Sequence, residues 1–348
     1  MFGTMSRKLT LLAAAALSLS LLAQAAEADE WKFAIEEITG SVQDKYAQEF
    51  KRIVEEKSGG DITVTVYPYG ALGTSADLTE LVTQDAIQFA NASPGHLGTL
   101  VPEIQVFSLT YLLSDNNDVN KKVLNESKVV YETLGADFET KGLKLLSMYP
   151  EGEMVWTTNK EIRKPADFDN FKMRVMVSPM LIEAYKAFGA SPTPLPYGEV
   201  YGGLQLKQID GQVNPIFAIE EMKFYEVSDY MIWAGQQQFT TTLVTNSDWY
   251  NADLSDEQRK LVDETVAAMA DFIFEVQDQY NSERLEVIKK SKPELMLIEL
   301  SPEERAVFRE ASMPARKKFV EMVGPRGQEI LDALMAEIDA AEKELGAN

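Results

Sequence analysis

The chain has 348 residues, of which 45% are hydrophobic, so it is long enough for two domains with sizeable cores. It carries a formal net charge of −22, with one histidine and no cysteine. The acidity argues against a nucleic-acid partner, and the lack of cysteine excludes disulfides, thiolate metal sites and cysteine nucleophiles.

The N-terminus has the pattern of a secretory signal peptide over residues 1–25. Arg7 and Lys8 precede an apolar, alanine-rich run from Leu9 to Leu22, and Ala23-Gln24-Ala25 is a small-residue cleavage site. The run is too short for a stable membrane span, and no cysteine follows it to carry a lipid. We therefore expect an exported, periplasmic protein, with a charge of −24 once Arg7 and Lys8 are removed.

Strands and helices alternate through the first part of the remaining chain. Helical spacing of apolar residues, followed by Ser58-Gly59-Gly60-Asp61, predicts a helix over Ser41–Lys57. Alternation of Ile or Val with Thr predicts a strand over Ile62–Tyr67. The other elements predicted here are strands at Trp31–Ala34 and Ala86–Ala90 and a helix around Leu78–Thr83. This order indicates an α/β architecture with a largely parallel sheet.

The pattern restarts near Leu143, which predicts a second α/β unit. The predicted elements are a helix over Met180–Phe188 and strands over Leu143–Tyr149, Met154–Thr158, Lys172–Met176 and Gln212–Phe217. The sequence has no repeat of fixed period. Two α/β units placed side by side are the simplest account of the chain.

An uninterrupted helical pattern covers Ser255–Lys290 and starts with a capping box of Ser255 and Gln258. A single helix of this length would reach roughly 50 Å, which is more than one small domain needs, and would brace two domains. The alternative is two helices joined at a kink. Ser301-Pro302-Glu303-Glu304 predicts the start of a further helix, and Gly327–Leu345 looks like a terminal amphipathic one.

The sequence lacks the motifs of common catalytic and cofactor sites. A serine triad would have to use the single His96, which follows Ser93-Pro94-Gly95 and has no GxSxG motif around it. Because HExxH, P-loop, GxGxxG and EF-hand patterns are missing, we expect no metal, no cofactor and no enzymatic activity. A hydrolase that uses a pair of carboxylates is an alternative, because the chain has 55 acidic residues.

The segment from Phe171 to Glu221 predicts a site that binds a solute. Arg174 lies in a short apolar strand, Asn214 precedes Pro215 at the end of another, and Tyr197 lies between them in the sequence. The planar fork of an arginine donates two parallel hydrogen bonds to a carboxylate, and an asparagine amide can orient a ligand. The alternatives are a structural ion pair for Arg174 and a turn-forming role for Asn214.

At these residues the chain resembles the periplasmic solute-binding proteins of tripartite ATP-independent periplasmic (TRAP) transporters, the family of the C4-dicarboxylate-binding component. The resemblance covers essentially the whole exported chain. It is carried by Ala71-Leu72-Gly73, Met148-Tyr149-Pro150-Glu151-Gly152, Lys172-Met173-Arg174-Val175 and Gly211-Gln212-Val213-Asn214-Pro215. Within the family the chain looks most like ectoine-binding members, through YPEGEM, EAYKAFGASPTPLP, GEVYGGLQ and NPIF.

The resemblance implies two α/β domains that close on a ligand and are braced by a long helix. The implied N-terminal domain covers 26–152 plus about 240–275, and the C-terminal domain covers 153–239 plus about 276–348. It also implies that Arg174 pairs with a ligand carboxylate, that Asn214 assists, and that Glu37 faces a cationic group of the ligand.

The residues around the implied ligand differ from those of ectoine-binding members. Phe239 matches one wall of their aromatic box. His96 stands where they have Phe, Tyr197 where they have Trp, and Ala218 where they have another aromatic. The resemblance therefore implies a thinner and more polar box. His96 could hydrogen-bond a hydroxyl or ammonium group when neutral, or help Arg174 to hold a second carboxylate when protonated.

By resemblance, the chain is the solute-binding receptor of a TRAP transporter and delivers its solute to the membrane permease subunits. The expected solute is a small zwitterion or carboxylate of the compatible-solute type. One alternative is a small amine or amino alcohol such as ethanolamine, held by Glu37, with Arg174 mainly structural. A further alternative is an exported hydrolase.

Overall fold

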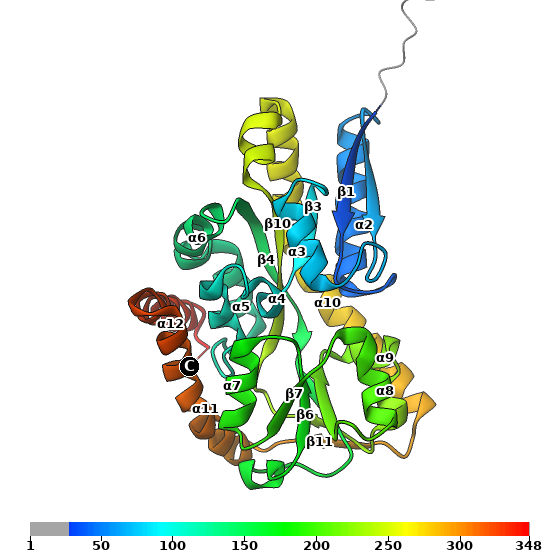
Figure 1. Cartoon of the computed structure of the whole chain (residues 1–348), viewed down its shortest axis with the longest axis vertical. Helices are drawn as coiled ribbons and strands as arrows, with labels where there is room; N and C mark the ends of the chain where they lie inside the picture. The colour runs from blue at the N-terminus through cyan, green and yellow to red at the C-terminus, as the bar shows by residue number, and fades with distance from the viewer. Residues whose placement is uncertain (1–27, 348) are drawn as a thin grey trace, which may run out of the picture.

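The computed structural model describes residues 28–347 and contains two β-sheets with helices packed around both (Figure 1). The predicted signal peptide lies outside the described residues. Within residues 28–347, none of the helices is both long and apolar enough to cross a membrane.

The first sheet has five strands in the order β2-β1-β3-β10-β4. They are β1 (Asp29–Ala34), β2 (Ile62–Tyr67), β3 (Phe89–Ala92), β4 (Leu143–Glu153) and β10 (Gln238–Asn246). The helices around it are α2 (Val42–Lys57), α3 (Ser75–Thr83), α4 (Pro94–Leu97), α5 (Asn117–Glu126) and α6 (Gly135–Glu139), with the shorter turns η1 (Pro102–Ser108), η2 (Val129–Leu134) and η6 (Trp249–Asp253).

The second sheet has six strands in the order β11-β9-β5-β8-β6-β7. They are β5 (Val155–Thr158), β6 (Lys172–Val175), β7 (Ser191–Pro194), β8 (Gly211–Asn214), β9 (Tyr230–Trp233) and β11 (Met296–Glu299). The helices of this layer are α7 (Pro179–Ala187), α8 (Val200–Gln205) and α9 (Ile216–Glu221), with the turns η3 (Pro165–Phe168), η4 (Tyr197–Glu199) and η5 (Phe224–Val227).

Both sheets are mixed, so the expectation of a largely parallel sheet is wrong. β1 is parallel to β2 and β3, and β6 is parallel to β7 and β8. However, β10 is antiparallel to β3 and β4, and β5 is antiparallel to β8 and β9. The antiparallel pairs arise where the chain passes from one sheet to the other, because β5 follows β4 of the first sheet and β10 follows β9 of the second.

Two predicted strand boundaries shift for local reasons. β3 begins at Phe89 because Asp85 adopts a left-handed backbone with φ of 56° and the next residues form a turn. β8 ends at Asn214 because Pro215 has no N–H to continue the ladder and instead precedes helix α9.

Each sheet has its own aromatic core. In the first, Phe33 packs edge-on against Phe50 of α2, with ring centroids 5.4 Å apart. In the second, Trp156 of β5 packs edge-on against Phe168 at 5.1 Å and against Phe308 at 5.3 Å. Separate cores are what two domains require.

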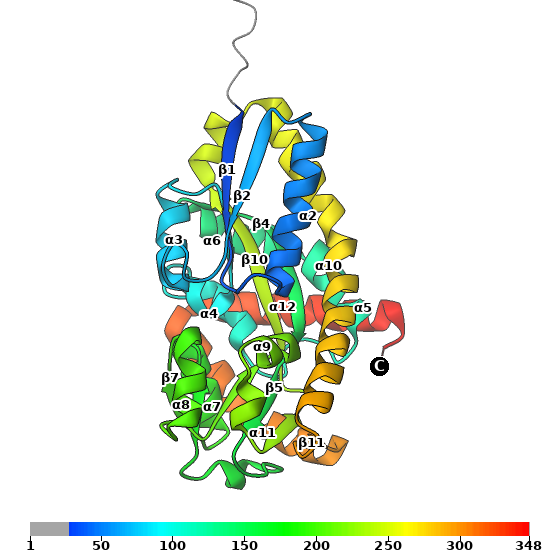
Figure 2. The same ribbon diagram turned by 90° about the vertical axis from the view of Figure 1, so that its right-hand side faces the viewer.

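The long helix α10 (Asp256–Ser291) is continuous over 36 residues, which favours the single helix over the alternative of two helices. The Ser255 hydroxyl accepts from the Gln258 N–H, and the Gln258 side chain accepts from the Ser255 N–H, as the capping box predicts. The helix packs against α2 and β4 on the first sheet and against α9 on the second. Figure 2 shows it running along most of the molecule, so it braces both layers.

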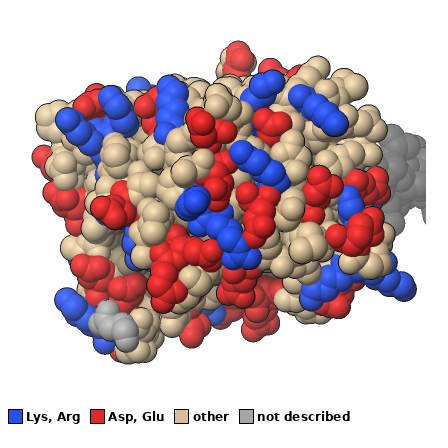
Figure 3. Space-filling model, turned by 90° about the horizontal axis from the view of Figure 1, so that it is seen from below, with Lys and Arg blue, Asp and Glu red and all other residues tan. Residues whose placement is uncertain are grey.

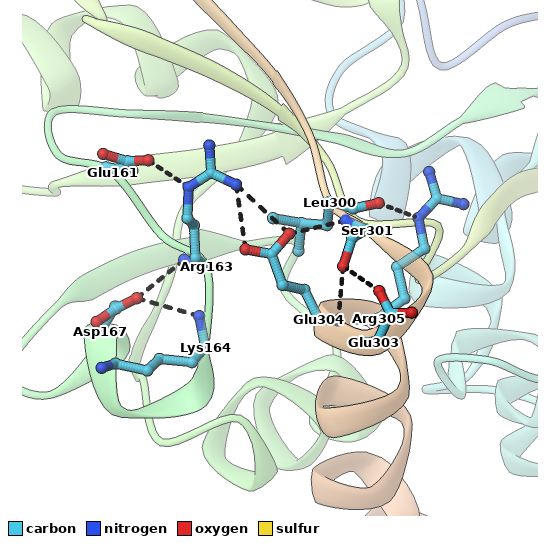
Figure 4. Close-up of polar contacts among 9 residues, drawn as sticks. All are labelled: Glu161, Arg163, Lys164, Asp167, Leu300, Ser301, Glu303, Glu304 and Arg305. Atoms are coloured by element: carbon cyan, nitrogen blue, oxygen red, sulfur yellow. Dashed lines mark hydrogen bonds and ion pairs between the residues drawn. The ribbon is translucent and has the colours of Figure 1, made fainter.

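The last two helices pack on different layers. α11 (Pro302–Val323) lies against α7 of the second sheet, whereas α12 (Pro325–Leu345) lies against α5 of the first. The N-terminus of α11 is fixed by a Ser301–Glu304 capping box and by Arg163, whose Nη1 lies 3.1 Å from the Glu304 carboxylate (Figure 4). The family resemblance assigns residues from about 276 onward to the C-terminal domain, and within this part α12 packs against α5 beside the first sheet.

The charge of the protein is spread over its surface. Acidic and basic side chains are interspersed over the face in Figure 3. Many are paired locally, as Arg52 is with Glu49 and Glu56 on α2. Such exposed pairs add little to stability, because solvent and salt screen them. On this face the basic side chains are interleaved with acidic ones.

Candidate ligand-binding site

Arg174 lies on β6 of the second sheet and is 2% exposed. Its Nε and Nη2 donate to the carbonyl oxygen of Leu195 at 3.1 and 2.8 Å. Its Nη1 is buried and has no partner in residues 28–347. Burial lowers the pKa of Arg174 to about 10, so the guanidinium stays charged at neutral pH. A buried guanidinium with a free N–H donor favours an anionic ligand group.

Tyr197 enters η4 after the proline-rich turn that follows β7. Its ring packs edge-on against Tyr69, which follows β2, at a centroid distance of 5.8 Å, so this contact joins the two layers. The Tyr197 hydroxyl is buried without a partner among the described residues. Burial raises the pKa of Tyr197 well above its usual value; Glu37 and Glu221 raise it further, and Arg174 lowers it. The hydroxyl therefore lies within electrostatic reach of charges of both signs.

Glu37 lies in the loop between β1 and α2 and is 6% exposed. One of its carboxylate oxygens accepts a hydrogen bond from the backbone N–H of Gln43 at 3.3 Å. Burial raises the pKa of Glu37 well above its ordinary value, and the charge of Glu151 together with a hydrogen bond to it raises it further. Burial and the neighbouring carboxylate therefore disfavour the charged form of Glu37, which a nearby cation would favour.

Two carboxylates that the sequence did not single out lie in the same region. Glu151, on β4, is fully buried; its Oε1 accepts from the Gln43 side chain at 2.9 Å, and its side chain is the hydrogen-bond partner of Glu37. Glu221 ends α9; its Oε1 accepts from the Tyr280 hydroxyl at 2.9 Å, and its Oε2 is buried and unpaired within the described chain. Burial raises the pKa of Glu151 to about 7 and that of Glu221 to about 8.

A weak signal for these two residues was present in the sequence. Glu151 lies in the YPEGEM segment, and Glu221 ends the segment that starts at Phe171. Neither stood out among 55 acidic residues, because burial and an unpaired oxygen are tertiary properties.

His96 lies on the short helix α4, and its Nδ1 is engaged by the protein itself. The Nδ1 atom is 2.8 Å from the Glu36 carboxylate and 3.1 Å from the Ser93 hydroxyl. The second oxygen of Glu36 accepts from the Ser93 N–H at 2.9 Å, which fixes the carboxylate. Helix α4 packs near β6, since a Cβ on Gly95 would lie 2.7 Å from Met176. His96 is therefore oriented by Glu36 on the side of the first layer that faces the second.

Asn214, Phe239 and Ala218 complete the set of residues considered. Asn214 ends β8, is 6% exposed, and donates through its amide to the Gln212 side chain. Phe239 lies on β10, is half-buried, and packs against the core of the second sheet. Ala218 is buried in α9, so its position adds no aromatic wall.

The structure brings Arg174, Tyr197 and Glu37 into one electrostatic neighbourhood, to which Glu151 and Glu221 also belong. Within residues 28–347, no hydrogen bond joins that group to the other predicted residues, His96, Asn214 and Phe239.

Asn281 of the long helix α10 forms hydrogen bonds to elements of both sheet layers. Its amide donates to the Glu151 carbonyl oxygen at 2.7 Å, and its carbonyl oxygen accepts from the Phe217 N–H at 3.1 Å. Gly152, with φ of 139°, leaves room for this side chain, because an added Cβ would lie 2.5 Å from the Asn281 amide. One side chain of α10 thus ties β4 to α9 beside the candidate site.

The model of the family described as bacterial extracellular solute-binding protein, family 7, matches residues 33–322. The chain belongs to this family. It is 44% identical to the ectoine-binding periplasmic protein TeaA of Halomonas elongata, over 93% of this chain and 94% of the relative. It is 43% identical to the ectoine/5-hydroxyectoine-binding periplasmic protein UehA of Ruegeria pomeroyi, over 94% and 96% of the two chains.

The solved structures agree with the family assignment. The fold superposes on the periplasmic ectoine-binding protein of the TeaABC TRAP transporter of Halomonas elongata with a TM-score of 0.86, covering 90% of this chain and 100% of that one. These findings confirm the predicted TRAP solute-binding family, the two-layer α/β fold with its long helix, and the periplasmic location. A family 7 protein is a solute receptor, so the buried polar groups around Tyr197 are candidates for ligand contacts.

Proposed function

We propose that this family 7 protein captures a small zwitterionic or carboxylate solute of the ectoine class. The observation that carries the proposal is Arg174, a buried and charged side chain whose Nη1 has no partner within the described residues. It acts on Tyr197, on which the carboxylates of Glu37 and Glu221 also act. Such a site has an anion-binding side and a cation-binding side, which suits a zwitterion. The relatives TeaA and UehA, named for binding ectoine and for binding ectoine or 5-hydroxyectoine, support the solute class.

In the proposed complex, the solute carboxylate accepts hydrogen bonds from Arg174, and Asn214 assists. Glu37 faces the cationic ring nitrogens. Phe239 forms one wall, and Tyr197 offers its unpaired hydroxyl. His96, held through Nδ1 by Glu36, presents its other ring nitrogen to a polar group of the solute.

The proposed mechanism is closure of two domains around the solute. The domains are those implied by the sequence, 26–152 plus about 240–275 and 153–239 plus about 276–348, with α12 packed on the first. A solute favours closure only by binding the closed form more tightly. The closed form then delivers the solute to the membrane permease subunits of a TRAP transporter, as the description of TeaA within TeaABC suggests. No catalytic step is proposed.

A small amine or amino alcohol such as ethanolamine is the second candidate solute. The contact that favours it is the pair of hydrogen bonds from Arg174 to the Leu195 carbonyl oxygen, which gives this arginine a structural role of its own. The buried carboxylates would then bind the amine, and Arg174 would not bind the solute.

A thermal-shift screen tests the proposal, because a ligand that binds the native state raises its apparent stability. A solute at 100 times its Kd adds about 2.7 kcal/mol. Ectoines should raise the unfolding temperature of the exported chain, and ethanolamine should not. A shift with amino alcohols alone would favour the second candidate, and consumption of a tested compound during incubation would instead indicate an enzyme.

A further inference from the structure

Three carboxylates from different parts of the fold act electrostatically on Tyr197. Glu37 comes from the loop after β1, Glu151 from the end of β4, and Glu221 from the last residue of α9. All three act on Tyr197 through their charge. They also act on one another: Glu151 on Glu37, Glu37 on Glu221, and Glu221 on Glu151. They therefore form one group, here named the acidic pole.

One member of the acidic pole keeps an oxygen without a donor from the described residues. Glu221 Oε2 is buried and unpaired there, although Oε1 of the same side chain accepts a hydrogen bond from Tyr280. Glu151 accepts from Gln43 through Oε1 and is the hydrogen-bond partner of Glu37. Buried acceptors are normally satisfied. The fold therefore leaves Glu221 Oε2 for a donor from outside the chain and holds Glu37 and Glu151 as a close pair of carboxyl groups beside it.

The acidic pole is held in position by α10. Tyr280 donates to Glu221 and in turn accepts from Arg284 at 2.5 Å. Asn281, the next residue, donates to the backbone carbonyl of Glu151. Side chains fixed by a second layer of contacts are typical of a built binding site.

Nearby cations neutralise the acidic pole only in part. Arg284 is shared with Glu220, whose carboxylate lies 3.4 Å from its Nη1. Arg174 acts on Tyr197 with the opposite charge and donates two of its hydrogen bonds to the Leu195 carbonyl. The Arg174 Nη1 and the Tyr197 hydroxyl are both buried and have no partner within the described residues.

We infer that Glu151 and Glu221 join Glu37 in recognising a cationic group of the solute, an amidinium or ammonium with at least two N–H donors. Glu151 and Glu221 are then specificity-determining residues. This inference rests on the proposed function, because it concerns the same site. It narrows the solute to a zwitterion whose cation faces the acidic pole and whose carboxylate faces Arg174.

The same arrangement rejects a second anionic group. A dicarboxylate held by Arg174 would place its other carboxylate against the acidic pole, where a cation would stabilise the charged forms of Glu151 and Glu221 and a second anion would oppose them. Glu151 and Glu221 would therefore make this protein bind zwitterions more tightly than dicarboxylates.

The test uses Glu151→Gln and Glu221→Gln, which keep the size and the acceptor oxygen but remove the charge. Glu153→Gln is the matched control, because Glu153 lies on the same strand and burial also raises its pKa, yet its carboxylate accepts from Gly235 and faces Arg305. Titration calorimetry with ectoine should show a loss of roughly 10- to 100-fold for each of the first two variants and no change for the control.

A second arm separates the two ends of the solute. The cyclic amidine ring of ectoine without its carboxylate should compete with ectoine for the wild-type protein, and succinate should bind more weakly than ectoine. If ectoine binds and depends on Arg174 but Glu151→Gln and Glu221→Gln bind it as the wild type does, the inference is overturned and the proposed function stands. If the wild type binds a carboxylate but no zwitterion, the inference is overturned, and if it binds neither, the proposed function itself fails. Should either variant not fold, competition by the amidine decides, and its failure to compete overturns the inference.

Discussion

Replacement of Arg174 by alanine is the sharpest perturbation of the proposed anion clamp. The guanidinium donates twice to the Leu195 carbonyl and leaves Nη1 free for a ligand. Removing one partner of a buried, hydrogen-bonded charge pair costs about 2–5 kcal/mol of binding free energy. At 1.4 kcal/mol per factor of ten, this is a loss of affinity for ectoine of roughly 30- to 4000-fold.

The same replacement also affects folding, in a separable way. The Leu195 carbonyl oxygen loses both donors from Arg174, which costs about 1–3 kcal/mol of unfolding free energy. Arg174→Lys keeps the charge but not the fork, so its affinity should fall between those of the alanine variant and the wild type. Arg163→Ala is the control, because Arg163 is an exposed arginine paired with Glu161 and Glu304, as Figure 4 shows.

The assay is titration calorimetry with ectoine, after circular dichroism and denaturant unfolding have shown that each variant is folded. The Arg163 variant should bind as the wild type does. An Arg174→Ala protein that is folded and retains wild-type affinity would refute the clamp and would favour the structural role of this arginine.

Three further predictions follow from the buried groups. Because burial raises the pKa of Glu151 from 4.5 to about 7 and that of Glu221 to about 8, the folded protein holds protons that the unfolded chain releases. The free energy of unfolding of the ligand-free protein should therefore fall as the pH rises from 4.5 to about 8, and Glu151 should contribute up to about 3 kcal/mol of this fall. In Glu151→Gln, the free energy of unfolding measured with urea should depend less on pH. Tyr197→Phe should leave the stability of the ligand-free protein unchanged or higher, since the hydroxyl is buried without a partner in the described residues. The same change should weaken ectoine binding by about 0.5–1.5 kcal/mol. A clear loss of stability in the same unfolding assay would contradict this prediction. Asn281→Ala should lower the midpoint of urea unfolding by the equivalent of about 1–3 kcal/mol, because the Phe217 N–H and the Glu151 carbonyl lose their partner. An unchanged midpoint would show that the contact between β4 and α9 does not depend on this side chain.

Local patterns predicted the elements that depend on local chemistry. The capping box at Ser255 and the unbroken helical spacing after it were enough to predict α10, and the Ile/Val–Thr alternation was enough for β2. β10 was not predicted, although it lies between β3 and β4, because its place in the sheet depends on a chain that returns from the second layer. The mixture of parallel and antiparallel strands in both sheets follows from the same passages of the chain between the two sheets.

The candidate site was predictable where residue type and position suffice. A strand that carries Arg174 and a strand end at Asn214 could be read from the sequence, and the family resemblance added Glu37. The unpaired Oε2 of Glu221 and the hydrogen bond between Glu37 and Glu151 could not, because they exist only when the loop after β1, the end of β4, α9 and α10 meet. The burial that raises the pKa of Glu151 and Glu221 is likewise a tertiary property.

The most direct test of the account is a calorimetric titration of the exported chain with ectoine at neutral pH and physiological salt. The account predicts saturable binding at one site per chain, competed by the amidine ring and abolished or strongly weakened by Arg174→Ala. Saturable binding of ethanolamine or of a dicarboxylate, with no heat from ectoine or any other zwitterion, would contradict it.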